Sequence, residues 1–220
     1  MEAEIKGGPA FAYIDIQLAP GEAVVAEPNA MSSMDNDIDL TATFNGGFFR
    51  GLMKKVLGGE SLFISRYKNN TEEPKRLTLV QPIPGEIRCI ELDNSEFHLQ
   101  PGAFLASTQD IKLGLRWAGL VSFIAGEGLF KLTVRGTGKV WYGAYGALIE
   151  KEVDGEYIVD TSHLVGYEPG IKLKLQLAGG LFSSFFGGEG LVTRVCGKGK
   201  IIVQSRSLSG LTAWLNPKFR

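Results

Sequence analysis

Three segments of the chain alternate strictly between apolar and polar residues. They span residues 38–44, 111–117 and 171–177, and each is seven residues long. Period-two alternation places the apolar side chains on one face of a β-sheet and the polar side chains on the other. The pattern predicts three equivalent strands, and no long amphipathic helix is visible in the sequence.

A glycine-glutamate motif follows each of these strands at a similar interval. Its glutamates are Glu60, Glu127 and Glu189, each directly preceded by glycine. Self-similarity at a fixed period is the signature of a repeat architecture. We therefore expect three repeats of short strands, at about 17–90, 91–150 and 151–213, within one domain that covers residues 1–220.

Downstream of the motif, residues 138–141 match residues 199–202, and in the first repeat we match them with residues 85–88. A polar insertion at 68–76 displaces this match and is typical of a hairpin tip or a solvated loop. Further strand candidates are β-branched or aromatic and are separated by turn residues. They are residues 12–18, 77–80, 87–92, 132–135, 140–142, 157–159 and 201–204.

The predicted fold class is all-β, a sandwich or barrel built by triplication. Three small β units cannot each bury a good core. We expect them to pack around a pseudo-threefold axis as a single domain.

An apolar, glycine-bracketed segment lies between each alternating strand and its glycine-glutamate motif. Connections normally run over the surface, yet these are unusually apolar, so two interpretations stay open. The segments fold back and close the ends of the barrel, or they gather as an exposed patch for a membrane surface, a protein partner or self-assembly. The candidate partner-binding or membrane-binding residues are Phe48, Phe49, Leu52, Met53, Leu120, Val121, Phe123, Leu181, Phe182, Phe185 and Phe186.

Composition and charge narrow the class of protein. Glycine supplies 29 of 220 residues, without the period of collagen, and the net charge is -1. That balance argues against a nucleic-acid partner, which needs a basic face. No signal pattern begins the chain and no apolar run reaches the about 18 residues that span a bilayer. We expect a cytoplasmic protein that can lie at the periphery of a membrane.

Residues with catalytic potential are sparse. Cys89 and Cys196 are too few for a disulfide scaffold, and we expect buried free thiols. The histidines, His98 and His163, are not clustered, so we expect no metal and no cofactor. His163 follows Ser162, but neighbours on a strand point to opposite faces, which disfavours a hydrolase pair and leaves a surface or half-buried histidine.

Two further motifs are given structural interpretations. The Gly-x-Gly-Lys motifs at 136–139 and 197–200 lack the phosphate-loop spacing, and we interpret them as hairpin turns. The repeated glutamates would bind a cation or share protons if they converge. The alternative is that each one accepts hydrogen bonds from turn backbone.

The sequence resembles the Altered Inheritance of Mitochondria protein 24 family over about residues 15–215. The resemblance rests on Pro20-Gly21-Glu22, Gly47-Phe48-Phe49 and the glycine-glutamate motif that occurs three times. It implies a triplicated β-structure similar to the tryptophan RNA-binding attenuation protein, of the double-stranded β-helix type. It implies no known enzymatic activity, no accepted catalytic residues and, for mitochondrial members, a link to inner-membrane organisation.

The leading hypothesis is a non-enzymatic binding or scaffold protein that presents the glycine-aromatic segments to a membrane surface or a protein partner. A homo-oligomer is compatible with it. The alternatives are a small-ligand binding protein or an enzyme, which would need a concave pocket with convergent polar groups. RNA binding is the least favoured alternative because the charge balance opposes it.

Overall fold

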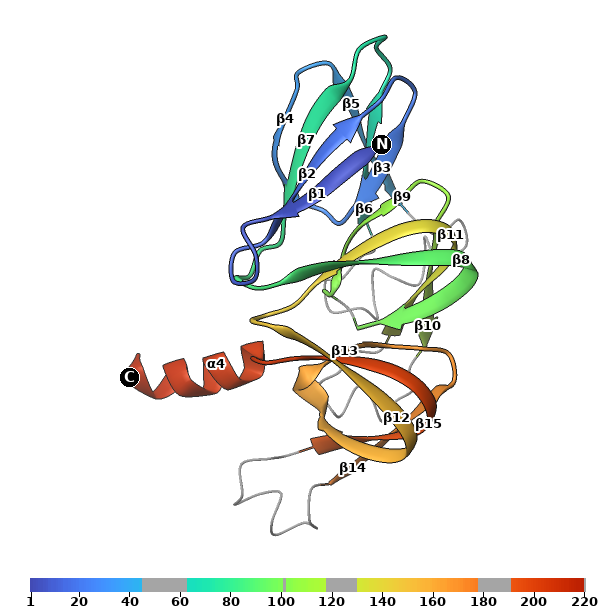
Figure 1. Ribbon diagram of the computed structural model, residues 1–220. Helices are drawn as coiled ribbons and strands as arrows, with labels where there is room; N and C mark the ends of the chain where they lie inside the picture. The colour runs from blue at the N-terminus through green and yellow to red at the C-terminus, as the bar shows by residue number, and fades with distance from the viewer. Residues whose placement is uncertain (45–62, 101, 118–129, 178–190, 220) are drawn as a thin grey trace. The chain divides into compact units, whose positions relative to one another are not determined.

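The computed structural model describes residues 1–44, 63–100, 102–117, 130–177 and 191–219 (Figure 1). These residues form antiparallel β-structure with one α-helix, so the predicted all-β class is confirmed. The chain divides into two compact units. Unit 1 holds Met1–Ser95, Phe104–Gly114 and Val134–Gly143, and unit 2 holds Glu96–Ala103, Leu115–Thr133 and Ala144–Arg220.

Unit 1 is a sandwich of two sheets. One sheet has the strand order β1-β2-β7-β4, and the other includes β11-β9-β3-β6-β5. Residues from both sheets, including Ile14, Leu77, Val24 and Trp141, are almost fully buried in one cluster. The strands are β1 (Glu2–Lys6), β2 (Tyr13–Leu18), β3 (Ala23–Ala26), β4 (Met31–Met34), β5 (Ile38–Phe44), β6 (Phe63–Asn69), β7 (Lys75–Val80) and β9 (Phe104–Thr108), with parts of β8 (Ile87–Leu99), β10 (Lys112–Trp117) and β11 (Phe130–Gly143).

Unit 2 is organised around one long strand, β15 (Leu191–Gln204). It pairs with β12 (Leu148–Asp160) along its length, with β14 (Ile171–Leu177) before residue 198 and with β13 (Leu164–Tyr167) after residue 200. The core of this unit includes Val195 and Ile201, which are fully buried. Helix α4 (Leu208–Leu215) follows β15 and ends in the short 3₁₀ turn η2 (Asn216–Lys218).

The Gly-x-Gly motifs lie inside strands, so their prediction as hairpin turns was wrong. Gly136 and Gly138 belong to β11, and Gly197 and Gly199 belong to β15. All four have positive φ, from 127° to 151°, which glycine adopts without steric cost. They let one strand bend, and in β15 the bend separates the part that pairs with β14 from the part that pairs with β13.

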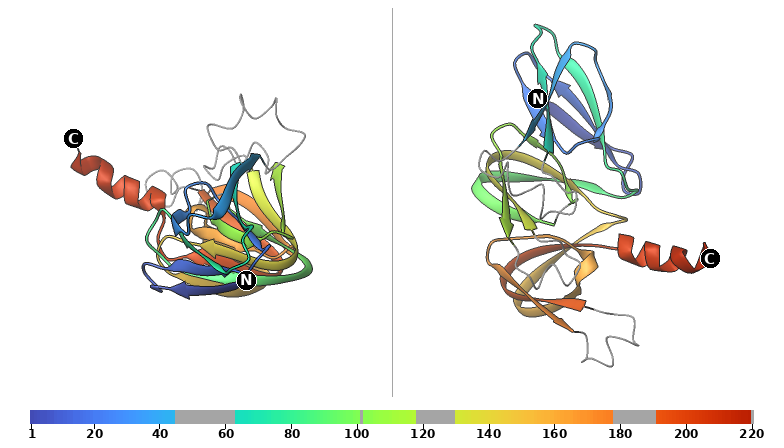
Figure 2. Two further views of the ribbon diagram at one scale, coloured as in Figure 1. Left: turned by 90° about the horizontal axis from the view of Figure 1, so that it is seen from above. Right: turned by 180° about the vertical axis from the view of Figure 1, so that it is seen from behind.

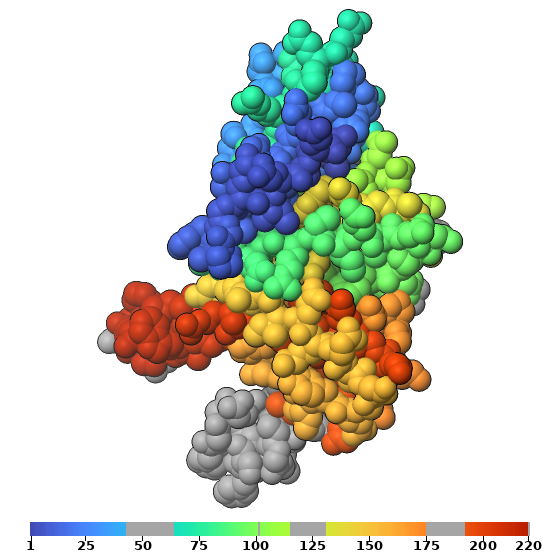
Figure 3. Space-filling view, in the orientation of Figure 1, coloured from blue at the N-terminus to red at the C-terminus, as the bar shows by residue number. Residues whose placement is uncertain are grey.

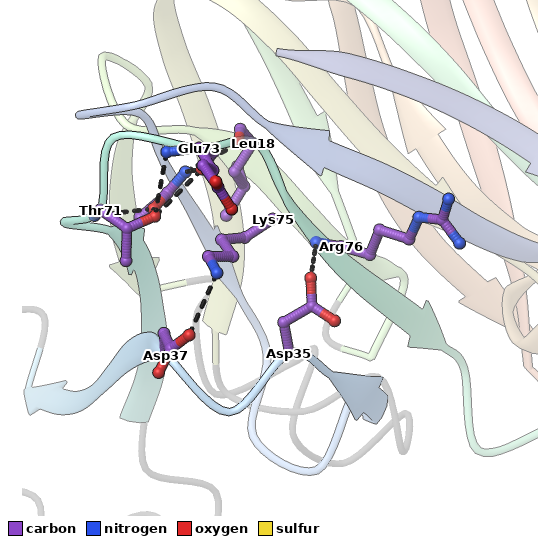
Figure 4. A network of polar contacts seen from close by, with 8 residues as sticks. Leu18, Asp35, Asp37, Thr71, Glu73, Lys75 and Arg76 are labelled. Carbon is purple, nitrogen blue, oxygen red and sulfur yellow. Dashed lines mark hydrogen bonds and ion pairs between the residues drawn. The ribbon is translucent and has the colours of Figure 1, made fainter.

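Residues 70–74 of the polar insertion form the turn between β6 and β7. These strands belong to different sheets, so the predicted loop is confirmed and the alternative of a hairpin tip is not. Asn69 is fully buried at the base of this turn. Its amide nitrogen donates to the carbonyl oxygens of Leu18 (2.9 Å) and Glu73 (2.7 Å), and its Oδ1 accepts from the Thr71 backbone (2.9 Å) and hydroxyl (2.8 Å). Figure 4 shows this network with its labelled partners. One buried amide therefore ties the turn to the end of β2.

The strand predictions hold well and the cysteine prediction does not. The three alternating segments are the strands β5, β10 and β14, in agreement with their period-two pattern. Cys89 is exposed and Cys196 is half-buried, so the expectation of buried thiols was wrong. An apolar strand context does not decide which face a residue occupies, and Cys89 falls on the exposed side of β8.

Candidate functional site

All eleven candidate residues of the glycine-aromatic segments lie outside the described residues, as do Glu60, Glu127 and Glu189. The structure describes the strands from which these segments depart. Strand β5 pairs with β6 through Phe44 and Phe63, and β14 pairs with β15 through Leu177 and Leu191. Strand β10 pairs with β11. Each segment therefore connects two neighbouring antiparallel strands.

Buried isoleucines occupy the start of all three alternating segments. Ile38, Ile111 and Ile171 are 4%, 6% and 4% exposed. The backbone N–H of each donates to the carbonyl oxygen three residues earlier, at 3.2, 3.2 and 3.0 Å. This is the hydrogen bond of a tight β-turn. The same local geometry therefore precedes each strand that leads into a glycine-aromatic segment.

The turn residues Asp35, Thr108 and Glu168 hold a second strand through their side chains. Asp35 Oδ2 accepts from the Arg76 backbone N–H at 2.8 Å (Figure 4). Thr108 Oγ1 accepts from the backbone N–H of Lys139 at 3.1 Å, and Glu168 Oε2 accepts from that of Lys200 at 2.8 Å. Three different side chains thus supply an oxygen to the same kind of backbone donor.

In the first third of the chain this hydrogen bond lies elsewhere than at residues 85–88, which the sequence comparison had matched. The donor that corresponds to Lys139 and Lys200 is Arg76, on β7, and not a residue of 85–88. Ile87 instead begins β8. The turn at 70–74 separates β6 from β7, whereas β11 and β15 each run through their Gly-x-Gly bend as one strand.

The histidines have structural partners. His98 is buried, with Nδ1 3.2 Å from Thr133 Oγ1 and its ring centroid 5.0 Å from that of Tyr167. His163 is half-buried, as predicted, and its Nδ1 lies 2.6 Å from the Gln204 carbonyl oxygen. The hydroxyl of Ser162 donates to Asp160 Oδ1 at 2.7 Å. Ser162 and His163 are therefore engaged separately and do not form a nucleophile–base pair.

Two glutamates of unit 1 have shifted pKa values. Desolvation by burial raises the pKa of Glu27 to about 7. For Glu22, burial opposes ionisation, but the N-terminal ammonium and the Ala19 N–H bond the carboxylate and lower its pKa overall. Perturbed carboxylates mark functional candidates only where they line a cleft.

A shallow hollow of about 130 Å³ lies beside Glu22. Its lining includes Met1, Thr108, Gln109 and Asp110. Pockets for small organic ligands usually enclose about 300–1,000 Å³, so the hollow is small for such a ligand. In the described part of the chain no group of three or more His, Cys, Asp or Glu side chains could hold a metal ion.

Helix α4 was missed from the sequence, and it exposes the large apolar side chains of Leu208 and Trp214. Ser207 caps it, with Oγ accepting from Gly210 N–H at 3.1 Å. None of its side chains is buried, and Trp214 is 62% exposed. The cap and the spacing of Leu208, Leu211 and Leu215 were signals that could have found it. No described helix is long and apolar enough to cross a membrane.

Comparison with known proteins places the chain in a family. The model of the family described as mitochondrial biogenesis AIM24 matches residues 3–206. The chain belongs to this family. The resemblance stated from the sequence is therefore confirmed. The AIM24 match covers nearly the whole chain.

Two relatives of this AIM24-family chain are bacterial. An uncharacterized protein of Streptococcus pyogenes serotype M6 is 27% identical over 207 residues, which cover 90% of this chain and 83% of the relative. The crystal structure of a Streptococcus pyogenes protein is 25% identical in sequence, covers 99% of both chains and superposes with a TM-score of 0.81. Neither description assigns a molecular activity.

Proposed function

We propose that this AIM24-family protein is a non-enzymatic binding or scaffold protein whose glycine-aromatic segments contact a membrane surface or a protein partner. The observation that supports the proposal is the pairing of the strands that flank the segments. Each of them joins two antiparallel strands, and a turn with the same hydrogen bond precedes each strand pair. A rigid strand pair that presents an apolar connection is a common way to position a binding loop.

The proposal includes a triplicated architecture. Support comes from the three turns at Asp35, Thr108 and Glu168, whose side chains accept from Arg76, Lys139 and Lys200. Three independent segments would not be expected to acquire the same pair of hydrogen bonds at the same place. A pseudo-threefold arrangement, similar to the tryptophan RNA-binding attenuation protein, is the packing that would bring three equivalent segments to one end.

A non-enzymatic role is favoured by how the polar side chains are used. His98 contacts Thr133, His163 contacts a backbone carbonyl oxygen, and the hydroxyl of Ser162 donates to Asp160. The described hollow beside Glu22 is shallow, and its size favours binding through a surface over binding in a pocket. The protein would act at the cytoplasmic side of a membrane or on a cytoplasmic partner.

Flotation with liposomes, together with crosslinking in cells, tests the proposal. Phe49→Ser, Phe123→Ser and Phe185→Ser should each weaken capture while the midpoint of thermal unfolding stays near that of the unmodified protein. Phe11→Ser is the matched control, because Phe11 is 75% exposed and lies outside the three segments. If the three segment variants unfold at clearly lower temperature and the Phe11 variant does not, the phenylalanines belong to the core and the proposal fails.

A further inference from the structure

Helix α4 carries an apolar stripe that no part of unit 2 covers completely. Leu208, Leu211 and Leu215 recur at the i, i+3, i+7 spacing that places side chains on one helical face. Leu208 is 49% exposed, and Leu211 and Leu215 are half-buried. Trp214 flanks the stripe and Phe219 follows it, at 62% and 80% exposed. Figure 3 shows the red atoms of this element at the surface.

Hydrogen bonds hold the residues just before α4 in place, so the position at which the helix begins is fixed. The backbone N–H of Ser205 donates to the Ala147 carbonyl oxygen at 2.9 Å, and that of Arg206 donates to the Tyr145 carbonyl oxygen at 3.3 Å. Ser205 Oγ also accepts from the Ala147 backbone at 2.8 Å. In both views of Figure 2 the helix continues from this point at the end of β15. The apolar side chains are therefore presented by a capped, anchored helix.

The charged residues that flank α4 in the sequence are all basic. No aspartate or glutamate occurs after Glu189, whereas Arg206 precedes the helix and Lys218 and Arg220 follow it. Lys218 Nζ lies 4.6 Å from the centroid of the Trp214 ring, within cation–π distance. The opposite face carries small uncharged residues, including Ser209 and Ala213, both exposed. Cations at both ends of an aromatic and leucine stripe complement an anionic surface.

We propose that α4 is an interfacial anchor that binds the surface of a membrane containing anionic lipids. Tryptophan and phenylalanine enter the boundary between headgroups and acyl chains, and the basic side chains pair with lipid phosphates. A helix of eight residues is about 12 Å long, too short to supply the about 800 Å² per partner of a stable dimer by itself. The anchor uses none of the glycine-aromatic segments, so it goes beyond the proposed function and is independent of it.

Cosedimentation of the full chain with vesicles tests the anchor. Vesicles of equal parts phosphatidylglycerol and phosphatidylcholine should bind the protein, pure phosphatidylcholine should bind it at least tenfold more weakly, and 0.5 M salt should release it. Trp214→Ser should weaken binding at least tenfold. Replacing Arg206 and Lys218 by glutamine should weaken it by about fivefold for each charge. Ala213→Gln, on the opposite face, is the matched control and should bind normally.

The outcomes separate the anchor from its alternatives. Absence of binding to anionic vesicles, or full binding by Trp214→Ser, overturns the proposal. If the protein does not bind vesicles but forms dimers that Trp214→Ser disrupts, a second copy of the chain occupies the stripe. Vesicle binding that survives Trp214→Ser and is lost in Phe49→Ser leaves the proposed function standing and removes the anchor. Because no side chain of α4 is buried, these variants should fold, which an unchanged thermal midpoint would verify.

Discussion

Glu168 and Lys200 are joined by two hydrogen bonds. The backbone N–H of Glu168 donates to the Lys200 carbonyl oxygen at 3.0 Å, and Glu168 Oε2 accepts from the Lys200 backbone N–H at 2.8 Å. The turn before β14 thereby fixes β15 at its glycine bend. Asp35 makes the corresponding pair with Arg76, with both contacts present, at 3.0 and 2.8 Å. In both cases the contact lies at the turn that precedes a strand leading into a glycine-aromatic segment.

Removing the side-chain acceptor at these turns should destabilise the fold. Glu168→Ala leaves the Lys200 N–H, in a part-buried contact, without its partner, which costs about 1–3 kcal/mol. Asp35→Ala should cost less, because its contact with the Arg76 N–H is exposed and water can replace the acceptor. Glu168→Gln keeps an acceptor oxygen and should cost less. Urea unfolding measures the differences. Equal stability of the alanine and glutamine variants would mean that the bond contributes nothing.

The glycine bend can be tested by adding a single methyl group. Gly197 has φ of 127° in β15, and a Cβ there would collide with the Gly170 carbonyl oxygen. Gly155 has a similar φ of 111° in β12, but a Cβ would meet nothing within 4 Å. Gly197→Ala should therefore be more destabilising than Gly155→Ala by about 1–3 kcal/mol, the usual cost of overpacking. Equal losses in urea unfolding would show that backbone strain alone requires glycine.

Asn69 should be the most sensitive residue of the β6–β7 turn. Asn69→Asp removes both amide donations, to Leu18 and Glu73, and buries a carboxyl group whose position is fully enclosed. We expect a loss of about 3 kcal/mol. Asn70→Asp is the control, because Asn70 is exposed and its hydrogen bond to Asp39 is long, at 3.5 Å. Similar thermal midpoints for the two variants would contradict the role assigned to Asn69.

The raised pKa of Glu27 predicts that the stability of the protein depends on pH. Its pKa is about 7 in the folded protein against an ordinary 4.5, because burial disfavours the charged form. The folded state then binds more protons than the unfolded state between those values, so stability falls as pH rises from 4.5 to 7 and is level above. Glu27→Gln should remove this slope and stabilise the protein at pH 8 by at most about 3 kcal/mol.

Urea unfolding from pH 4.5 to 8 measures the slope. Glu72→Gln is the control, since Glu72 is exposed in the turn between β6 and β7, and it should leave the dependence unchanged. A slope that persists in Glu27→Gln would assign the effect to another group.

Much of the strand structure was predictable because period-two alternation is a direct consequence of a half-buried strand. The three alternating segments begin with buried isoleucines, Ile38, Ile111 and Ile171. The glycine bends were not predictable, since a glycine with positive φ inside a strand looks the same in sequence as one in a turn. Helix α4 is only eight residues long, so a search for long amphipathic helices missed the signals that its cap and leucine spacing carry. The placement of the candidate segments stays a prediction, because it depends on packing between distant parts of the chain.

The most direct test of the central claim is hydrogen exchange of residues 45–62, 118–129 and 178–190 in the folded protein, alone and with anionic vesicles or a crosslinked partner. The account predicts fast exchange of all three segments in the free protein and marked slowing of all three on binding. Protection in the free protein equal to that of β5 and β6 would contradict it, because the segments would then be part of the core.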